Sequence, residues 1–188
     1  MSVRENIVLF MEEKLYKPMT REELAKSFEI DKKDMKDFFE ILDSMEKEGA
    51  IIKTRNDLYG LPEKMNLVVG VLEGNERGYG FVIPDDKEKA DIYISAEDMN
   101  GALHGDKVIA RILKKGENGK REEGEILRVL SRANETIVGT FEHNKNFGFV
   151  LPDDSKISMD VFVSKADMNG AKNNQKVVVE ITRWPEKR

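Results

Sequence analysis

The sequence predicts an α+β protein made of several small domains, in which a helical N-terminal segment precedes two copies of one all-β fold. Three observations support this prediction. Hydrophobic residues recur at helical spacing up to about residue 62. The rest of the chain contains an internal repeat, and both copies consist of short β-branched and aromatic runs separated by turn-forming residues. We expect domains at residues 1–65, 66–133 and 134–188.

The first domain is expected to contain three helices. The inward positions of the first helix are Ile7, Phe10, Met11 and Leu15, which have the spacing of one helix face. The run from Thr20 to Glu23 matches a capping box, so a second helix should begin there. Asp31 is a candidate cap for the third helix, which Gly49 should end.

A short hairpin should follow these helices, with a turn at Asn56 and Asp57. Three helices and a hairpin predict a winged helix-turn-helix. A helix that reads DNA usually presents Arg, Asn or Gln to base edges, but residues 31–37 contain only Asp, Lys and Met. A structural or regulatory role is therefore favoured over sequence-specific DNA binding, and DNA is not an expected partner. Lys32, Lys33 and Lys36 could still contact RNA phosphates.

The internal repeat covers most of the remaining chain. Residues 69–86 recur as 138–154, and residues 91–109 recur as 160–178. So many matched positions in the same order indicate two copies of one fold. The first copy should have strands near residues 68–73, 79–83, 91–95, 107–113 and 125–130.

Five short strands in a domain of this size are typical of the OB-type barrel, which closes on itself and leaves no exposed sheet edge. The second copy ends before any counterpart of the fifth strand, Glu125 to Leu130. We therefore expect a truncated second barrel without its closing strand, and a chain that was cut from a longer protein.

Composition limits the possible functions. The 188 residues include no cysteine, which excludes disulfides and thiolate zinc sites and favours a reducing cytoplasm. No apolar stretch is long enough to cross a bilayer, so no membrane partner is expected. The 31 Lys and Arg against 36 Asp and Glu give a net charge of -5, so nucleic-acid binding must depend on local surface chemistry.

Aromatic residues form the candidate binding surfaces. Tyr79 and Phe81 flank a glycine and should share one strand face, while Val82 points to the other. If the aliphatic residues fill the barrel, the aromatic residues face outward, where they can stack on bases. The opposite orientation would leave a wet face of Ile and Val, which is less favourable. The candidate stacking residues are Tyr79, Phe81 and Tyr93 in the first copy and Phe147, Phe149 and Phe162 in the second.

Basic residues near these aromatic residues could contact phosphates, although lysines are common on any solvated surface. The candidates are Arg77, Lys107 and Arg111 in the first copy and Lys145, Lys165 and Lys176 in the second. No catalytic or metal-binding residue is expected. The paired aspartates at 85–86 and 153–154 each follow a proline and are interpreted as turn residues, and His104 and His143 show no ligand spacing.

Several of these motifs resemble a known family. Phe147 to Val150 and Asp160 to Val163 are similar to the RNA-binding signatures of cold-shock domains. A winged helix ending in residues 59–64, a barrel with Gly78 to Phe81 and His104 to Val108, and then a second barrel resemble the N-terminal part of ribonuclease R-type enzymes of the ribonuclease II family. The resemblance covers essentially the whole chain.

The resemblance implies a missing 3′-to-5′ exoribonuclease domain whose aspartates hold magnesium, together with a further OB-type domain. It also implies that the two barrels guide single-stranded or structured RNA toward that domain. This chain itself should be inactive and need no cofactor. Two other functions stay open: a free-standing RNA-binding or RNA-chaperone protein, and a winged-helix DNA-binding regulator. The incomplete second copy favours RNA guidance for an exoribonuclease.

Overall fold

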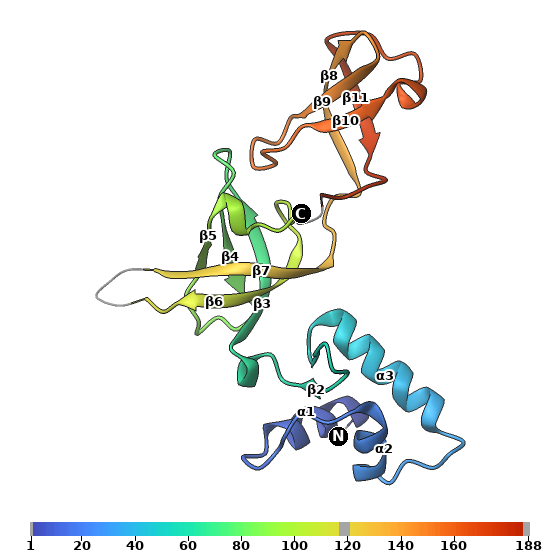
Figure 1. Ribbon diagram of the computed structural model, residues 1–188, viewed down its shortest axis with the longest axis vertical. Helices are drawn as coiled ribbons and strands as arrows, with labels where there is room; N and C mark the ends of the chain where they lie inside the picture. Colours follow the sequence, from blue (N-terminus) through green and yellow to red (C-terminus); the bar gives the residue numbers. More distant parts are fainter. Residues whose placement is uncertain (1, 117–120, 186–188) are drawn as a thin grey trace. The chain divides into compact units, whose positions relative to one another are not determined.

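The computed structural model describes residues 2–116 and 121–185, which form two compact units, residues 1–69 and 70–188 (Figure 1). The first unit is helical and the second is β-rich, which gives the α+β class expected from the sequence. None of the described helices is long and apolar enough to cross a membrane.

The first unit contains three helices and a two-stranded hairpin. Its elements are α1 (Val3–Glu12), α2 (Arg21–Ser27), α3 (Met35–Glu48), β1 (Ile52–Lys53), β2 (Tyr59–Gly60) and the 3-10 helix η1 (Glu63–Met65). The hairpin strands are antiparallel, with Ile52 opposite Gly60. A residue with positive φ, Asp57, lies in the turn between the strands.

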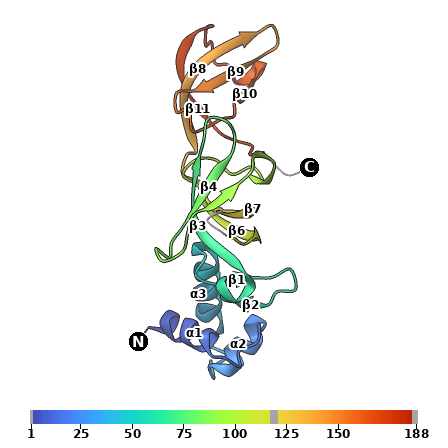
Figure 2. The same cartoon turned by 90° about the vertical axis from the view of Figure 1, so that its left-hand side faces the viewer.

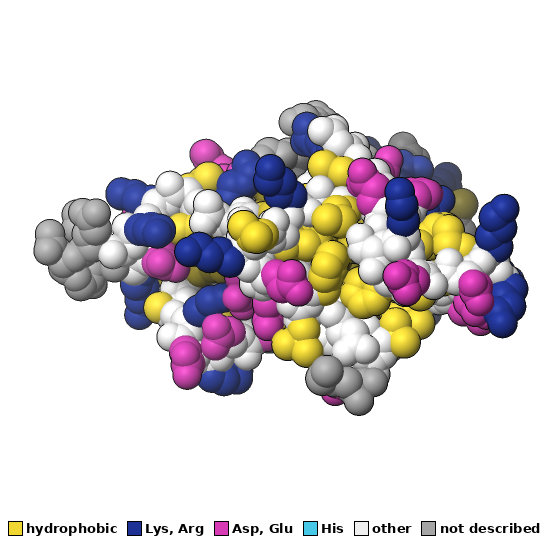
Figure 3. Space-filling model, turned by 90° about the horizontal axis from the view of Figure 1, so that it is seen from below, with side chains coloured by type: hydrophobic (Ala, Val, Ile, Leu, Met, Phe, Trp, Pro, Cys, Tyr) yellow, Lys and Arg dark blue, Asp and Glu magenta, His cyan; other side chains and the backbone are white. Residues whose placement is uncertain are grey.

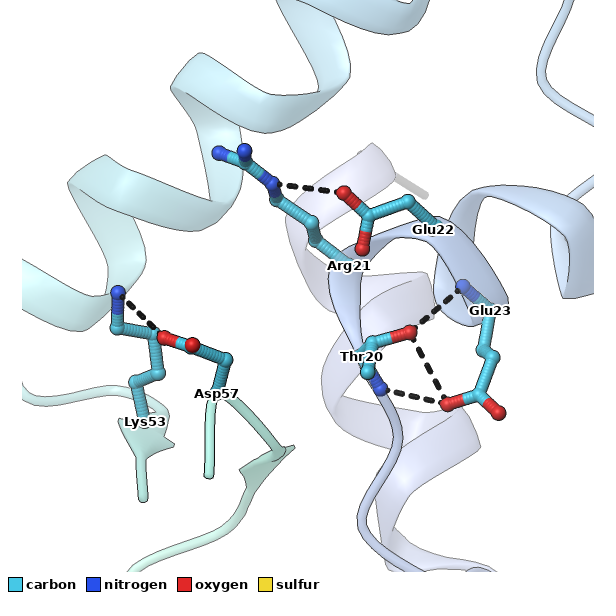
Figure 4. A network of polar contacts seen from close by, with 6 residues as sticks. All are labelled: Thr20, Arg21, Glu22, Glu23, Lys53 and Asp57. Atoms are coloured by element: carbon cyan, nitrogen blue, oxygen red, sulfur yellow. Dashed lines mark hydrogen bonds and ion pairs between the residues drawn. The ribbon is translucent and has the colours of Figure 1, made fainter. Parts of the chain in front are cut away.

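The helix ends follow the predicted caps with one exception. Thr20 accepts a hydrogen bond from the backbone N–H of Glu23, whose carboxylate accepts one from the N–H of Thr20, so α2 begins with the expected capping box (Figure 4). Gly49 ends α3 in the left-handed conformation with φ 82°. The prediction that Asp31 caps α3 was wrong, because the chain first makes a turn in which the N–H of Asp34 bonds to the carbonyl of Asp31.

The helices pack around one hydrophobic core. Its fully buried members are Ile7, Met11, Leu24, Ala25, Phe38, Leu42, Met45, Ile51 and Tyr59. Leu15 was expected inside but is 89% exposed, because α1 ends at Glu12. The Tyr16 hydroxyl donates to the carbonyl oxygen of Tyr59, 2.8 Å away, and burial raises the pKa of Tyr16 to about 12.

The first repeat copy is a closed five-stranded barrel with strand order β3-β4-β5-β7-β6. Its strands are β3 (Leu67–Gly74), β4 (Gly80–Pro84), β5 (Ile92–Ile94), β6 (Lys107–Lys114) and β7 (Glu122–Ser131). The five strands agree with the predicted ones, although β7 starts three residues before the expected Glu125. Strand β7 runs parallel to β5 and antiparallel to β6, and so joins them.

The second copy forms a four-stranded antiparallel sheet in the order β10-β9-β8-β11 (Figures 1 and 2). Its strands are β8 (Thr136–Asn144), β9 (Phe147–Pro152), β10 (Val161–Ser164) and β11 (Gln175–Glu180). Short 3-10 helices follow β5 and β10, namely η2 (Ala96–Asp98) and η3 (Lys165–Asp167). In the described part of the chain no strand joins β10 to β11, the positions that β7 joins in the first copy.

The interior of both copies is aliphatic at the predicted positions. Val82, Ile92 and Ile94 are fully buried in the barrel, and Val150 and Val163 are 1% and 6% exposed in the second copy. Since successive strand residues point to opposite faces, the neighbouring aromatic residues point outward. The outward orientation expected from the sequence is therefore confirmed for these strands.

Candidate nucleic-acid interface

Three aromatic side chains form one cluster on the outside of the barrel, which we call the first aromatic face: Tyr79, Phe81 and Tyr93. Antiparallel pairing places Phe81 directly opposite Tyr93. The ring centroids of Tyr79 lie 5.9 Å from Phe81 and 5.6 Å from Tyr93, and those of Phe81 and Tyr93 are 5.8 Å apart. All three side chains are partly exposed.

The second copy has the same arrangement, the second aromatic face: Phe147, Phe149 and Phe162. Phe149 lies opposite Phe162 in the strand register. The ring centroids are 5.6 to 5.8 Å apart, and Phe162 is 61% exposed. Such an exposed group of phenylalanines is unfavourable in water unless a flat apolar partner covers it, and a nucleobase is a partner of that kind.

The glycine inside each aromatic pair has a steric cause. A Cβ on Gly80 would lie 2.8 Å from the carbonyl oxygen of Glu73 on the adjacent strand β3. A Cβ on Gly148 would collide with the buried ring of Phe141. Only glycine lets the neighbouring strand or side chain approach this closely. The same glycine thus lets the strand that carries the two outward rings pack closely against its neighbours.

Three of the predicted phosphate-binding residues are engaged in ion pairs, two of them at equivalent places in the two copies. Lys107 pairs with Asp85, and Lys176 pairs with Asp153 at the equivalent place in the second copy. Both aspartates follow the last residue of β4 or β9, at the strand end opposite to the aromatic residues. The structure therefore does not bring Lys107 and Lys176 to the aromatic faces.

The other four basic candidates lie elsewhere on the two copies. Arg77 and Lys145 are exposed, each two residues before the first ring of an aromatic face, and Lys165 starts η3 directly after β10. Arg111 lies on β6 and pairs with Glu125, with 3.4 Å between the guanidinium Nη1 and the carboxylate Oε1. Arg77, Lys145 and Lys165 are thus the candidates closest in sequence to the aromatic residues.

Sequence reasoning missed Arg121. Its guanidinium carbon lies 4.9 Å from the ring centroid of Phe81, within the range of a cation–π interaction. Arg121 directly precedes β7, and β7 runs parallel to β5 with Glu123 opposite Tyr93. A parallel fifth strand beside the aromatic residues was the signal that could have identified it.

The paired aspartates and His104 have structural hydrogen-bond partners. Asp86 and Asp154 each accept a backbone hydrogen bond two residues ahead, 3.0 Å long, which confirms their turn role. His104 Nδ1 accepts from the N–H of Gly74 at 3.2 Å. Within residues 2–116 and 121–185 no three His, Asp or Glu side chains gather as a metal site would require, so these residues do not fit the magnesium centre that the resemblance implies.

Charge is mixed rather than concentrated. On the face shown in Figure 3, Asp and Glu side chains lie among the Lys and Arg side chains, which are more frequent toward the left, and hydrophobic side chains gather in the middle and on the right. This agrees with the net charge of -5. Long-range attraction of a polyanion is consequently weak.

Comparisons with known proteins agree with the β-barrel and β-sheet folds of the two repeat copies. The family model described as Ribonuclease B OB domain matches residues 70–129, and the one described as Cold shock domain matches residues 149–188. A yeast structure, the pseudonuclease Ssd1, aligns with a TM-score of 0.53 and 23% identity over 65% of this chain and 21% of that chain, which supports the fold alone.

Two curated relatives match nearly the whole chain. Ribonuclease R of Escherichia coli strain K12 is 38% identical over 173 residues, which are 92% of this chain and 21% of that protein. Ribonuclease R of Thermotoga maritima is 40% identical over 174 residues, which are 90% of this chain and 24% of that protein. The chain therefore spans about a fifth to a quarter of these relatives, and it belongs to the ribonuclease R family, matching its N-terminal region.

Proposed function

We propose that this chain binds single-stranded RNA on its two aromatic faces and guides the RNA to the catalytic domain of a 3′-to-5′ exoribonuclease. The observation that supports this most directly is the second aromatic face, where three phenylalanines lie within 6 Å of one another and Phe162 is 61% exposed. Stacking on an aromatic ring is available to every base, so such a face suits RNA of any sequence passing through.

The rest of the proposal rests on the relatives, which bear the name ribonuclease R and are four to five times longer than the matched part. In this proposal hydrolysis and its magnesium ions belong to the remaining part of the protein. The first unit would be a winged helix-turn-helix with a structural or regulatory role. We also propose three domains near residues 1–65, 66–133 and 134–188, working in the reducing cytoplasm that the cysteine-free sequence favours.

The test removes stacking and charge separately. Changing Phe147, Phe149 and Phe162 to alanine should weaken binding of single-stranded RNA at least about a hundredfold, because each stacked base contributes roughly 1 to 3 kcal/mol. The slope of log affinity against log salt should stay nearly unchanged. Changing Lys145 and Lys165 to alanine should instead flatten that slope by about 0.7 per lost phosphate contact.

Affinity is measured by fluorescence anisotropy at several salt concentrations, after circular dichroism has shown that each variant is folded. A folded triple-alanine variant that binds RNA as tightly as the parent chain would refute the proposed binding surface. Shortening of labelled RNA by the purified 188-residue chain, abolished by a chelator, would contradict the assignment of hydrolysis to another part of the protein.

A further inference from the structure

The two repeat copies differ at one loop although its backbone is the same. In both copies an Asn and a Gly with positive φ follow the 3-10 helix, with 48° and 76° at Asn100 and Gly101 and 46° and 76° at Asn169 and Gly170. After this turn the first copy has Leu103, His104 and Asp106, where the second has Lys172, Asn173 and Gln175. Because the same turn forms with either set of residues, the turn alone does not explain why the first copy has Leu103, His104 and Asp106.

Asp106 has a structural role in the first copy, where its carboxylate is fully buried. It accepts hydrogen bonds from the N–H groups of Leu103 at 2.9 Å and Ala133 at 3.0 Å. The Nη1 of Arg132 donates to it at 2.8 Å and also to the carbonyl of Gly101 at 2.8 Å. A buried charge requires such partners. Asp106 therefore fixes the segment that connects β7 to β8.

The other side of Arg132 contacts the second copy. Its guanidinium carbon lies 3.9 Å from the ring centroid of Trp184, which follows β11. Next to it, Pro185 lies so close to Gly101 that a side chain at Gly101 would collide with its carbonyl. Asp106, Arg132 and Trp184 thus form a continuous contact from the barrel to the end of the second sheet.

Apolar side chains pack beside the contact between Arg132 and Trp184. Leu103 packs with Ile137 and Ile157 of the second copy, and all three are at most 7% exposed. Trp184 packs against the same cluster. On another side, the Nζ of Lys156 lies 2.6 Å from the carboxylate of Glu73. At the position equivalent to Leu103 the second copy has Lys172, which is exposed.

Both aromatic faces border these contacts. Phe81 lines a cleft of about 460 Å³ together with Ser155 and Lys156 of the second copy. Phe162 lines a cavity of about 510 Å³ together with Leu103 of the first copy and Trp184. The position of one aromatic face relative to the other therefore depends on how the two copies are joined.

We propose that Leu103, Asp106, Arg132 and Trp184 form a rigid joint that holds the two aromatic faces at a fixed spacing, so that one RNA strand contacts both. This inference rests on the proposed function. Arg132 and Trp184 are positioning residues, and they act on RNA through the faces they hold. Fixing two binding surfaces in advance raises affinity only for an RNA long enough to reach both.

The test exchanges residues between the copies. Leu103→Lys gives the first copy the residue that the second tolerates, and Lys172→Leu is the matched control. Trp184→Ala is a second joint variant, because it removes the contact with Arg132 and leaves the Asp106–Arg132 pair in place. The independent readout is ¹⁵N relaxation of the whole chain, which should show the two copies tumbling separately in the joint variants and together in the parent and the control.

RNA affinity is then measured with oligouridylates of about 4 nucleotides, which one barrel can hold, and of about 32 nucleotides, twice the largest site size of one barrel. The joint variants should bind the longer RNA roughly tenfold more weakly and the shorter RNA within about twofold of the parent. Equal tumbling in all variants, or separate tumbling with unchanged affinity for the longer RNA, would overturn the joint. If the parent binds neither RNA, the proposed function fails while relaxation still tests rigidity.

Discussion

The two repeat copies carry the same aromatic motif in different surroundings. Their ring centroids are spaced alike, 5.6 to 5.9 Å apart in the first copy and 5.6 to 5.8 Å in the second. Yet Phe162 is 61% exposed, while its counterpart Tyr93 is half-buried beside β7 and its neighbour Phe81 lies under Arg121. Exposure of an aromatic face is therefore determined by the adjoining strand, whereas the motif determines only the spacing.

The largest expected effect is a difference between the two aromatic faces in how much RNA affinity is lost when their rings are removed. Changing Phe147, Phe149 and Phe162 to alanine should reduce affinity roughly tenfold more than changing Tyr79, Phe81 and Tyr93, because the second face is more exposed and no described arginine covers its rings. Equilibrium binding of both triple variants to one single-stranded RNA measures this. Equal losses would show that exposure in the free chain does not decide which face dominates.

A second prediction concerns the edges of the second sheet. Arg183 aligns with Lys114, so a second copy of residues 120–131 added after Arg188 would stand at the spacing of β7 in the repeat. Such a strand can pair parallel to β10 and antiparallel to β11, as β7 does with β5 and β6. Closing the sheet buries apolar surface and removes two edges.

The extended chain should unfold at a higher temperature, by about 5 °C, the shift that roughly 1 kcal/mol produces in a small domain. It should also show less concentration-dependent association in sedimentation velocity. The control has the added residues in scrambled order. A scrambled extension that stabilises the chain equally would mean that strand pairing is not the cause.

The fold was largely predictable because hydrophobic periodicity and the repeat are local signals. The pairs Thr20 with Glu23 and Phe81 with Val82 determine a cap and a strand face without distant contacts. The stacking residues followed from the same alternation. Their outward position is confirmed, while their RNA contacts stay a prediction.

Side-chain partners across the barrel could not be predicted in this way. Lys107 pairs with Asp85 and Arg121 covers Phe81 through contacts between strands that are far apart in sequence. Long side chains reach several partners, and only the three-dimensional arrangement selects among them. The contact of Arg132 with Trp184 could not be predicted from the sequence for the same reason.

The smallest expected effect is a pH dependence at the contact between the copies. The hydrogen bond from Lys156 lowers the pKa of Glu73, and the bond to Glu73 raises the pKa of Lys156. A lowered carboxyl pKa stabilises the folded state above the unfolded pKa, and this contribution is lost as pH falls through the folded value. A raised lysine pKa contributes below the unfolded pKa and is lost as pH rises through the folded value. The ion pair therefore contributes its full stabilisation of the folded state at pH values between the unfolded pKa of Glu73 and the unfolded pKa of Lys156.

Because both groups are at the surface, the contribution should be small and sensitive to salt. Glu73→Gln should lower the unfolding temperature slightly at neutral pH and leave it unchanged in acid, where the parent has lost the same contact. The matched control is Glu142→Gln, since Glu142 is the repeat equivalent of Glu73 and forms no ion pair with a described residue. Calorimetry from acid to alkaline pH, at low and high salt, should show a difference for Glu73→Gln alone. A difference that persists in acid would assign the effect to packing at this contact, and the two copies would then be joined there without electrostatic help.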